Sequence, residues 1–174
     1  MPGPNPLVGV QLHSYTDPMP VFRDQPFSTD GLGSGLFRPH GRADWRIDGA
    51  VLRTDVVGPF NRELAEAIGP ILHQAYALVS AQGPCAEIVT VRGSALAGPE
   101  ALTALSGVLQ KFVLEGVAPV ATAFVMAPEV EGSHFMPALL VQSFAAAGWP
   151  ACQVFGTAEE AEAWVQGLLA AARG

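Results

Sequence analysis

The spacing of hydrophobic positions changes near residue 58 of the chain. Before that point, short apolar runs at residues 36–38, 43–47 and 51–57 are separated by turn signals at Gly41 and Asp48-Gly49. Alternating apolar and polar positions bounded by such turns are typical of β-hairpins. The first part of the chain therefore predicts three strands that form an antiparallel edge.

Helical periods follow, interrupted by short apolar runs. Apolar residues spaced by three and four predict a helix from about residue 64 to 79, which Gly69-Pro70 should kink. Residues 86–91 then form a short β-branched run, typical of a strand. A second helix begins with Pro99 in its first turn and ends at Gly116.

The last third of the chain continues this alternation. Residues 117–126 are the most apolar stretch and predict a central strand that is buried on both faces. We expect a third helix over residues 135–147, a strand over 151–155, and a fourth helix that begins at Thr157. Glu160 lies three residues after Thr157, as in a capping box.

This order of elements, β-β-β-α-β-α-β-α-β-α, predicts an α/β fold. Right-handed crossovers make the later strands parallel, so we expect a mixed, mostly parallel sheet of four to five strands with an antiparallel N-terminal edge and about four helices. Residues 1–34 hold six of the 15 prolines and show no sustained period. We therefore expect a Pro/Gly-rich arm over residues 1–34 and one domain over 35–174.

Composition and charge exclude some partners. The chain has 174 residues, 49% of them hydrophobic and 14% charged, with a net charge of −7. A single acidic domain whose only lysine is Lys111 repels phosphate backbones, so nucleic-acid binding is not expected. No apolar stretch approaches the roughly 20 residues of a membrane-spanning helix. The N-terminus lacks the pattern of a secretory signal, so we expect a cytoplasmic protein.

Three segments carry a resemblance to a known family. They are Gly58-Pro59-Phe60-Asn61 before the first helix, Gly98-Pro99-Glu100-Ala101-Leu102 at the second, and Thr157-Ala158-Glu159-Glu160-Ala161 followed by Trp164 at the fourth. Over roughly residues 35–172 the chain resembles the bacterial SpoIIAA-like group of STAS and CRAL-TRIO-related domains. The resemblance implies a mixed sheet with helices, no cofactor, no enzymatic activity, and binding of a protein partner or a ligand.

The phosphorylated turn of switching STAS proteins differs in this chain. Where an Asp-Ser-Ser-Gly-like turn would open the second helix, residues 92–98 read Arg-Gly-Ser-Ala-Leu-Ala-Gly. The Asp and the paired Ser are missing, and Ser94 is the nearest hydroxyl. The resemblance therefore does not carry the phosphorylation switch over to this chain.

Ligands of open parallel sheets gather beyond the carboxyl ends of the strands, and this edge gives the candidate binding residues. They are Phe60, Asn61, Arg92, Ser94, Glu129, Glu131 and His134. Asn61 is most simply a helix N-cap, with ligand contact as the alternative. Glu129, Glu131 and His134 are residue types that bind metal or move protons. Their spacing matches no known metal site, so a solvated loop is the simpler interpretation.

Arginine and aspartate are interleaved along the first strands. Arg38, Arg42, Arg46 and Arg53 accompany three aspartates. Such residues could bind an anion or an acidic partner, but ion pairing across an exposed sheet face is commoner. We therefore expect ion pairs there.

Three functions remain open on the sequence alone. The first is a non-enzymatic binding or regulatory module that contacts a protein partner, with a homodimer as one form of contact. The second is a carrier of a small apolar ligand or lipid, in a pocket under the third helix formed by Phe135, Met136, Leu139 and Leu140. The third is an enzyme that uses Glu129, Glu131 and His134.

Overall fold

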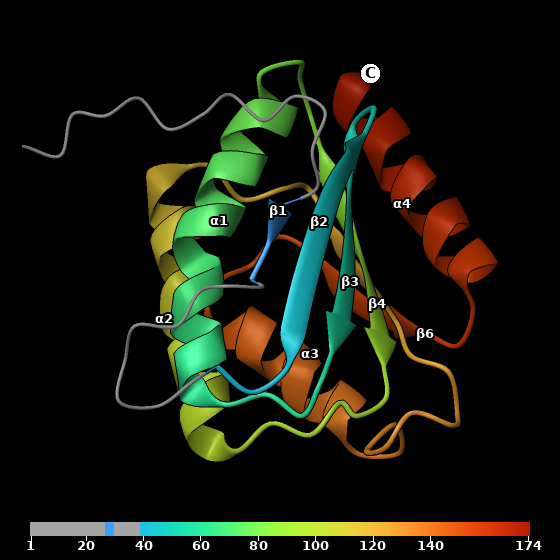
Figure 1. Cartoon of the computed structure of the whole chain (residues 1–174). Coiled ribbons are helices and arrows are strands. Elements are labelled where there is room, and N and C mark those ends of the chain that lie inside the picture. The colour runs from blue at the N-terminus through green and yellow to red at the C-terminus, as the bar shows by residue number, and fades with distance from the viewer. Residues whose placement is uncertain (1–26, 30–38) are drawn as a thin grey trace, which may run out of the picture.

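A computed structural model describes residues 27–29 and 39–174 of the protein (Figure 1). Six strands form one sheet in the order β1-β2-β3-β4-β5-β6. They are β1 (Phe27–Ser28), β2 (Arg42–Asp48), β3 (Val51–Val57), β4 (Ala86–Arg92), β5 (Thr122–Val125) and β6 (Cys152–Phe155). The pairs β1–β2 and β2–β3 are antiparallel, and the remaining pairs are parallel. The predicted α/β class, the mostly parallel sheet and its antiparallel edge are confirmed.

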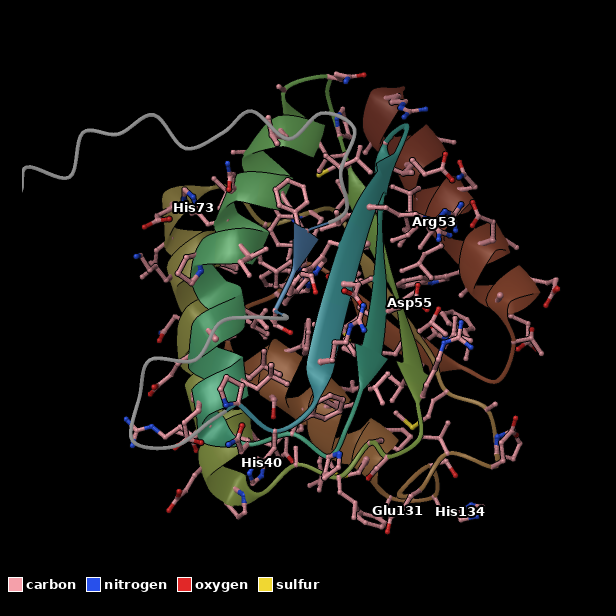
Figure 2. All side chains as sticks on the ribbon, in the orientation of Figure 1. His40, Arg53, Asp55, His73, Glu131 and His134 are labelled. Carbon is pink, nitrogen blue, oxygen red and sulfur yellow. The ribbon has the colours of Figure 1, made fainter. Side chains whose placement is uncertain are left out.

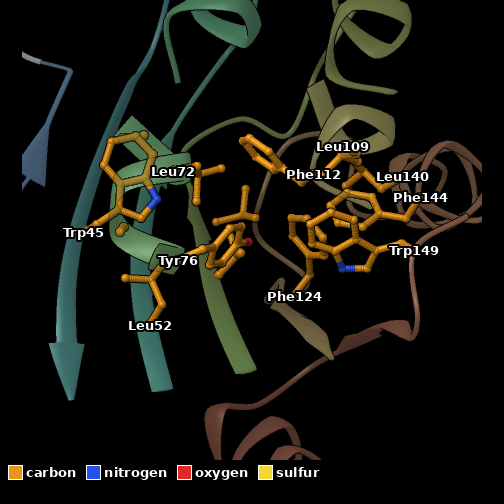
Figure 3. Packing of buried hydrophobic residues seen from close by; sticks show 14 of the residues in the cluster. Trp45, Leu52, Leu72, Tyr76, Leu109, Phe112, Phe124, Leu140, Phe144 and Trp149 are labelled. Atoms are coloured by element: carbon orange, nitrogen blue, oxygen red, sulfur yellow. The ribbon is translucent and has the colours of Figure 1, made fainter. Parts of the chain in front are cut away.

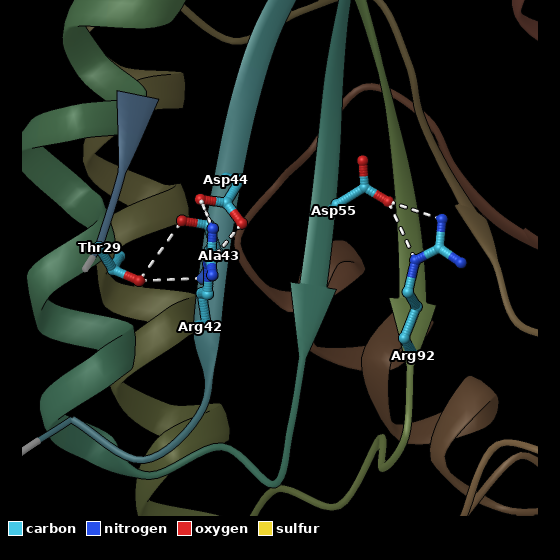
Figure 4. Close-up of polar contacts among 6 residues, drawn as sticks. All are labelled: Thr29, Arg42, Ala43, Asp44, Asp55 and Arg92. Atoms are coloured by element: carbon cyan, nitrogen blue, oxygen red, sulfur yellow. Dashed lines mark hydrogen bonds and ion pairs between the residues drawn. The ribbon is translucent and has the colours of Figure 1, made fainter. Parts of the chain in front are cut away.

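The sheet has one or two strands more than the four to five expected. β1 was not among the predicted strands. Just after it, the Thr29 backbone N–H donates to the Ala43 carbonyl at 2.9 Å. The Thr29 Oγ1 accepts from the Ala43 N–H, also at 2.9 Å (Figure 4). β1 falls within the segment predicted as an arm. The strand predicted at residues 36–38 and the rest of that arm lie outside the described residues.

The central strand β5 is shorter than its apolar run. Only Thr122–Val125 form the strand, and all four residues are buried, as expected for a strand covered on both faces. Pro119 has no backbone N–H to donate to a neighbouring strand, so regular pairing begins after it. The prediction of a strand over residues 117–126 was therefore right in its position and wrong in its length.

Four helices cover the two faces of the sheet. They are α1 (Arg62–Ser80), α2 (Pro99–Glu115), α3 (Met136–Ala146) and α4 (Ala158–Arg173). α1, α2 and α3 lie on one face and α4 lies alone on the other (Figure 1). The larger core therefore forms between the sheet and α1 to α3.

Local signals account for the ends of the helices. The Asn61 side chain accepts the Leu64 backbone N–H at 3.1 Å, so this residue caps α1 as expected. Thr157 accepts the Glu160 N–H at 3.3 Å and caps α4, while its hydroxyl donates to the Glu160 carboxylate. Gly116 ends α2 with φ +71°, a left-handed conformation that favours glycine. α1 runs on through Pro70 without a break.

Aromatic rings fill the larger core (Figure 3). The Phe124 and Phe144 rings meet edge to face at 5.4 Å, and Phe144 meets Trp149 at 5.5 Å. Tyr76 of α1 meets the Phe112 ring of α2 edge to face at 5.8 Å. Such contacts hold α3 against β5 and α1 against α2.

Ion pairs join charged residues of β2, β3 and β4 (Figure 4). Arg42 pairs with Asp44 at 2.7 Å, and Arg92 of β4 pairs with Asp55 of β3 at 3.1 Å. Asp44 of β2 directly faces Asp55 of β3, so this pair of opposite positions carries like charges.

The ion pairs expected of the first arginines are present in part, because Arg42 and Arg53 form them, no ion pair of Arg46 is found within the described residues, and Arg38 lies outside those residues. Arg53 pairs with Asp48 of β2 at 2.7 Å and with Glu162 of α4 at 3.0 Å.

Candidate functional site

An apolar cavity of about 110 Å³ lies between the sheet and helices α1 and α2, with α3 at one end. Its walls are residues of β2 to β5, of the three helices and of the turns that follow β3 and β4. The helical wall consists of Leu64, Ala65, Ile68, Leu72 and Tyr76 from α1, Ala101, Leu102, Leu105 and Leu109 from α2, and Leu140 and Phe144 from α3.

Small side chains open this space. Five of the lining residues are alanines, at positions where the sheet, the turns and the helices face one another: Ala43, Ala65, Ala95, Ala97 and Ala101. Each alanine lacks the branched or aromatic side chain that normally fills a core position. The cavity is thus a product of residue choice within regular elements.

Among the described residues, Glu87 of β4 is the one carboxyl group that lines the cavity. Its side chain is 4% exposed. The Thr54 hydroxyl donates to Oε1 at 2.6 Å, and the Tyr76 hydroxyl donates to Oε2 at 2.6 Å. Both carboxyl oxygens therefore have a partner from the protein itself.

Burial controls ionisation in this part of the core. Desolvation raises the pKa of Glu87, although hydrogen bonds from Thr54, Tyr76 and Thr122 oppose the rise. Burial and the nearby Glu87 charge also raise the pKa of Cys85 to about 11 and the pKa of Cys152 to about 12. Both thiols are protonated at neutral pH and are poor nucleophiles.

The raised pKa of Glu87 makes stability depend on pH. The Glu87 carboxyl group has a pKa of about 4.3 in the unfolded chain and a higher pKa in the folded protein. Between these two values it is protonated in the folded state and ionised in the unfolded state. The stabilisation that this pKa difference gives is complete below the pKa of the unfolded carboxyl group. It is lost as the pH rises through the pKa of the folded state. We therefore expect the free energy of unfolding of wild type to fall relative to that of Glu87→Gln as the pH rises.

Urea denaturation of both proteins at steps from pH 4 to pH 8 measures this difference. The glutamine does not titrate, and the other carboxyl groups are common to both proteins, so their contributions cancel. A difference that stays constant, or that moves in favour of wild type, would contradict the expected protonation of Glu87.

Trp45 of β2 also lines the cavity. The side chain is 1% exposed, and its indole Nε1 has no hydrogen-bond acceptor within the part of the chain that the structure describes. In Figure 3 the indole nitrogen lies on the side of the ring turned toward Leu72 and Tyr76, which also line the cavity. A buried donor without an acceptor is uncommon in native proteins.

The structure places the predicted edge residues in different environments. Phe60 is half-buried and lines the cavity. Asn61 caps α1 and also accepts the His40 backbone N–H at 2.8 Å. Arg92 is engaged with Asp55, and Ser94 is 5% exposed, with its Oγ accepting the Leu96 N–H at 3.2 Å. Of these four, Phe60 is the one that contributes to the cavity.

The loop of residues 127–135 joins the same end of the sheet. The Ala95 N–H donates to the Glu131 carbonyl at 2.8 Å, and the Glu131 N–H donates to the Gly93 carbonyl at 3.0 Å. Glu129, Glu131 and His134 are exposed, as expected of a solvated loop. Figure 2 shows Glu131 and His134 at one end of the molecule, with His73 near the other. The described residues contain no group of three or more His, Cys, Asp or Glu side chains that could hold a metal ion.

Four residues were predicted to form a pocket under the third helix. Of its four residues, Leu140 lines the cavity and Met136 is buried in the core. Phe135 is 55% exposed and Leu139 is 39% exposed. The Phe135 and Leu139 side chains point outward because each directly precedes a buried position, Met136 or Leu140. The cavity lies mainly under α1 and α2.

Glu87 and Trp45 were not among the residues predicted from the sequence. A single glutamate inside the apolar run of residues 86–91 was a usable signal, because a charged residue in a buried strand needs partners. Trp45 gave no such signal, since a tryptophan in a strand is ordinary core.

The class of protein defined here is a mixed α/β domain with an apolar cavity on the three-helix face of its sheet. Compared with known protein families and with curated proteins, the chain matches no family model and no curated protein. Within the described residues, no helix combines the length and the apolar character needed to cross a membrane.

Proposed function

We propose that the protein binds a small apolar molecule in the cavity between the sheet and α1 and α2. The observation that carries the proposal is the cavity itself, about 110 Å³ of space walled almost entirely by aliphatic and aromatic side chains. Close packing normally leaves few voids larger than a water molecule in a protein core. A larger apolar void costs stability, and a ligand that fills it recovers the lost contacts.

The volume limits the ligand to a compact molecule. A cavity of roughly 150 Å³ lined by aliphatic and aromatic residues is known to accept benzene. A space of about 110 Å³ is smaller, so it suits a compact ligand of at most about six heavy atoms. At about 0.6 kcal/mol per heavy atom, such a ligand would bind with a Kd of about 2 mM.

The polar groups of the wall favour binding without chemistry. The Glu87 carboxyl group and the Tyr76 hydroxyl are hydrogen-bonded to each other at 2.6 Å. The Thr54 hydroxyl is directed to the same carboxyl group. These groups support the wall of a binding site, and we assign no reaction to them.

Filling the cavity from α1 should abolish binding. Ala65 is buried and lines the cavity, so the side chain of Ala65→Leu should occupy the space that the ligand needs. We expect the Kd for benzene, a compact six-carbon hydrocarbon, to rise at least about tenfold. Titration followed by NMR chemical shifts of the backbone amides measures the change.

The matched control for this substitution is Ala77→Leu, which adds the same atoms to an exposed position of the same helix. Its Kd should stay within about twofold of wild type. Binding that survives Ala65→Leu unchanged would place the ligand outside the cavity and contradict the proposal.

A second candidate function is contact with another protein surface through α3. Phe135 and Leu139 lie one helical turn apart and are 55% and 39% exposed. Exposed apolar side chains that adjoin one another favour an interaction site, and a second copy of the chain is the partner that the pure protein can test.

We expect light scattering at increasing concentration to give a mass above the 18.1 kDa of one chain. Phe135→Ser should return the mass to that of one chain, because it removes the larger of the two apolar side chains. Leu114→Ser, at an 81% exposed position of α2, is the control and should leave the association unchanged. A wild-type protein that stays monomeric at every concentration would contradict association through α3.

A further inference from the structure

We propose that a ligand enters the cavity at the carboxyl edge of the sheet, between the first turns of α1 and α2, and that the Phe60 side chain controls its passage. This inference rests on the proposed function and adds the way in which the same site exchanges its ligand. It depends on where the lining residues are exposed, on how α1 and α2 are joined, and on how Phe60 is held.

The opening of the cavity lies at one end. The cavity is not sealed, because part of its boundary reaches the surface. Farther along the helices, Leu72, Tyr76 and Leu109 line the cavity and are buried. The half-buried lining residues lie at the end of β3, in the turns after β3 and β4, or in the first two turns of α1 and α2: Val56, Phe60, Ile68, Ala97, Leu102 and Leu105. The cavity is therefore closed at the far end and open at the carboxyl edge, where ligands of parallel sheets enter.

Contacts between α1 and α2 close the route between the two helices beyond their first turns. Gly69 of α1 packs against Val108 of α2, and a Cβ atom at residue 69 would lie 3.4 Å from both Val108 Cγ atoms. Farther along, His73 Nε2 lies 3.0 Å from a carboxylate oxygen of Glu115. A ligand that passed between the helices here would have to separate packed elements, which is costly in a close-packed interior.

Phe60 is the bulkiest side chain at the opening. Its ring lies over Gly58, since a Cβ atom at residue 58 would lie 2.9 Å from one of the ring carbons. Among the described residues, Phe60 is the one aromatic lining residue that is partly exposed. The other aromatic lining residues, which are all buried, are Trp45, Tyr76, Phe124 and Phe144. The Phe60 ring thus stands between the interior of the cavity and the surface.

The backbone on both sides of Phe60 is held, so the side chain is the part that can move. The Phe60 N–H donates to the Leu96 carbonyl at 2.8 Å. The next residue, Asn61, caps α1 by accepting the Leu64 N–H at 3.1 Å. Partly exposed side chains change rotamer far faster than packed elements separate. Rotation of the Phe60 ring therefore opens the entrance and leaves the backbone in place.

The test measures the association rate of benzene, because Kd alone does not report an entrance. NMR line shapes and relaxation dispersion give the dissociation rate, and its ratio to Kd gives the association rate. If the open rotamer is populated to about 10% or less, Phe60→Ala should raise the association rate at least about tenfold. A residue that only lines the wall behaves differently, because its removal raises the dissociation rate and Kd together and leaves the association rate unchanged.

A second variant and a control accompany this measurement. Phe60→Leu keeps an apolar side chain of intermediate size, so it carries the test if Phe60→Ala does not fold, and it should raise the association rate about threefold. The control is Leu109→Val, which shortens a buried lining residue at the closed end. Its association rate should stay within about twofold of wild type.

The outcomes separate the inference from the function on which it rests. If benzene binds in the cavity and neither Phe60 variant changes its association rate, the entrance at Phe60 is overturned and the proposed function stands. If Leu109→Val raises the association rate as much as the Phe60 variants do, the path lies elsewhere and the entrance is again overturned. If wild type binds no benzene in the cavity, the proposed function itself fails.

Discussion

Replacing Tyr76 with alanine is expected to lower the free energy of unfolding by about 4 kcal/mol, as large aromatic truncations in cores do. The Tyr76 side chain is fully buried. Its ring meets Phe112 at 5.8 Å and Trp149 at 6.2 Å, and its hydroxyl donates to Glu87 at 2.6 Å. The substitution removes packing between α1, α2 and the sheet and also leaves Glu87 with one partner fewer. Urea denaturation measures the loss.

The control for this change is Tyr76→Phe, which keeps the ring and removes the hydroxyl. It should cost about 1 to 2 kcal/mol, the range for a buried carboxyl group that loses one hydrogen bond. A Tyr76→Ala protein within about 1 kcal/mol of wild type would show that Tyr76 does not bridge the helices and the sheet as described.

Glu87→Ala is the second change with a large expected effect, a loss of about 3 kcal/mol. The substitution removes the carboxyl group that accepts hydrogen bonds from both the Thr54 and the Tyr76 hydroxyls. Both buried hydroxyls then lack this acceptor. Each buried hydroxyl that loses its partner costs about 1 to 3 kcal/mol. Thermal and urea denaturation at a pH near the stability maximum should both report the loss.

Glu87→Gln is the matched control, because its amide has the same shape and can still accept from one hydroxyl and donate to the other. We expect it to cost about 1 kcal/mol or less. Equal losses for the alanine and glutamine variants would contradict the stabilising contribution assigned to the hydrogen bonds of Glu87.

The sequence predicted the regular elements of the fold because those elements depend on local patterns. The alternation in residues 51–57 matches β3, Pro99 begins α2, and the Asn61 and Thr157 side chains cap their helices. β5 is shorter than its apolar run because hydrophobicity alone does not show where Pro119 interrupts the pairing.

The cavity and its polar groups depend on contacts between segments far apart in the chain. Thr54 meets Glu87 only because β3 and β4 pair in parallel with Leu52 beside Glu87, which brings Thr54 within 2.6 Å of the carboxyl group. Tyr76 reaches the same group from α1. A sequence pattern fixes the face of each residue within its own element, but it does not fix the register between elements.

The edge residues show the same limit in another way. Ser94 was placed correctly after β4, yet its side chain is buried and bound to the Leu96 N–H. The exposure of a turn residue depends on whether the following loop covers it. Here the Glu131 backbone pairs with residues 93 and 95, although Glu131 lies far from them in the sequence.

The most direct test of the proposed binding function is to locate an apolar probe on the protein. Isotope-edited NOE spectra of labelled wild-type protein with unlabelled benzene report which side chains lie beside the probe. We predict NOEs to methyl groups of Ile68, Leu72 and Leu105, which line the cavity from α1 and α2. NOEs confined to exposed side chains such as Leu114 and Leu139, with none to the cavity wall, would contradict the proposed function.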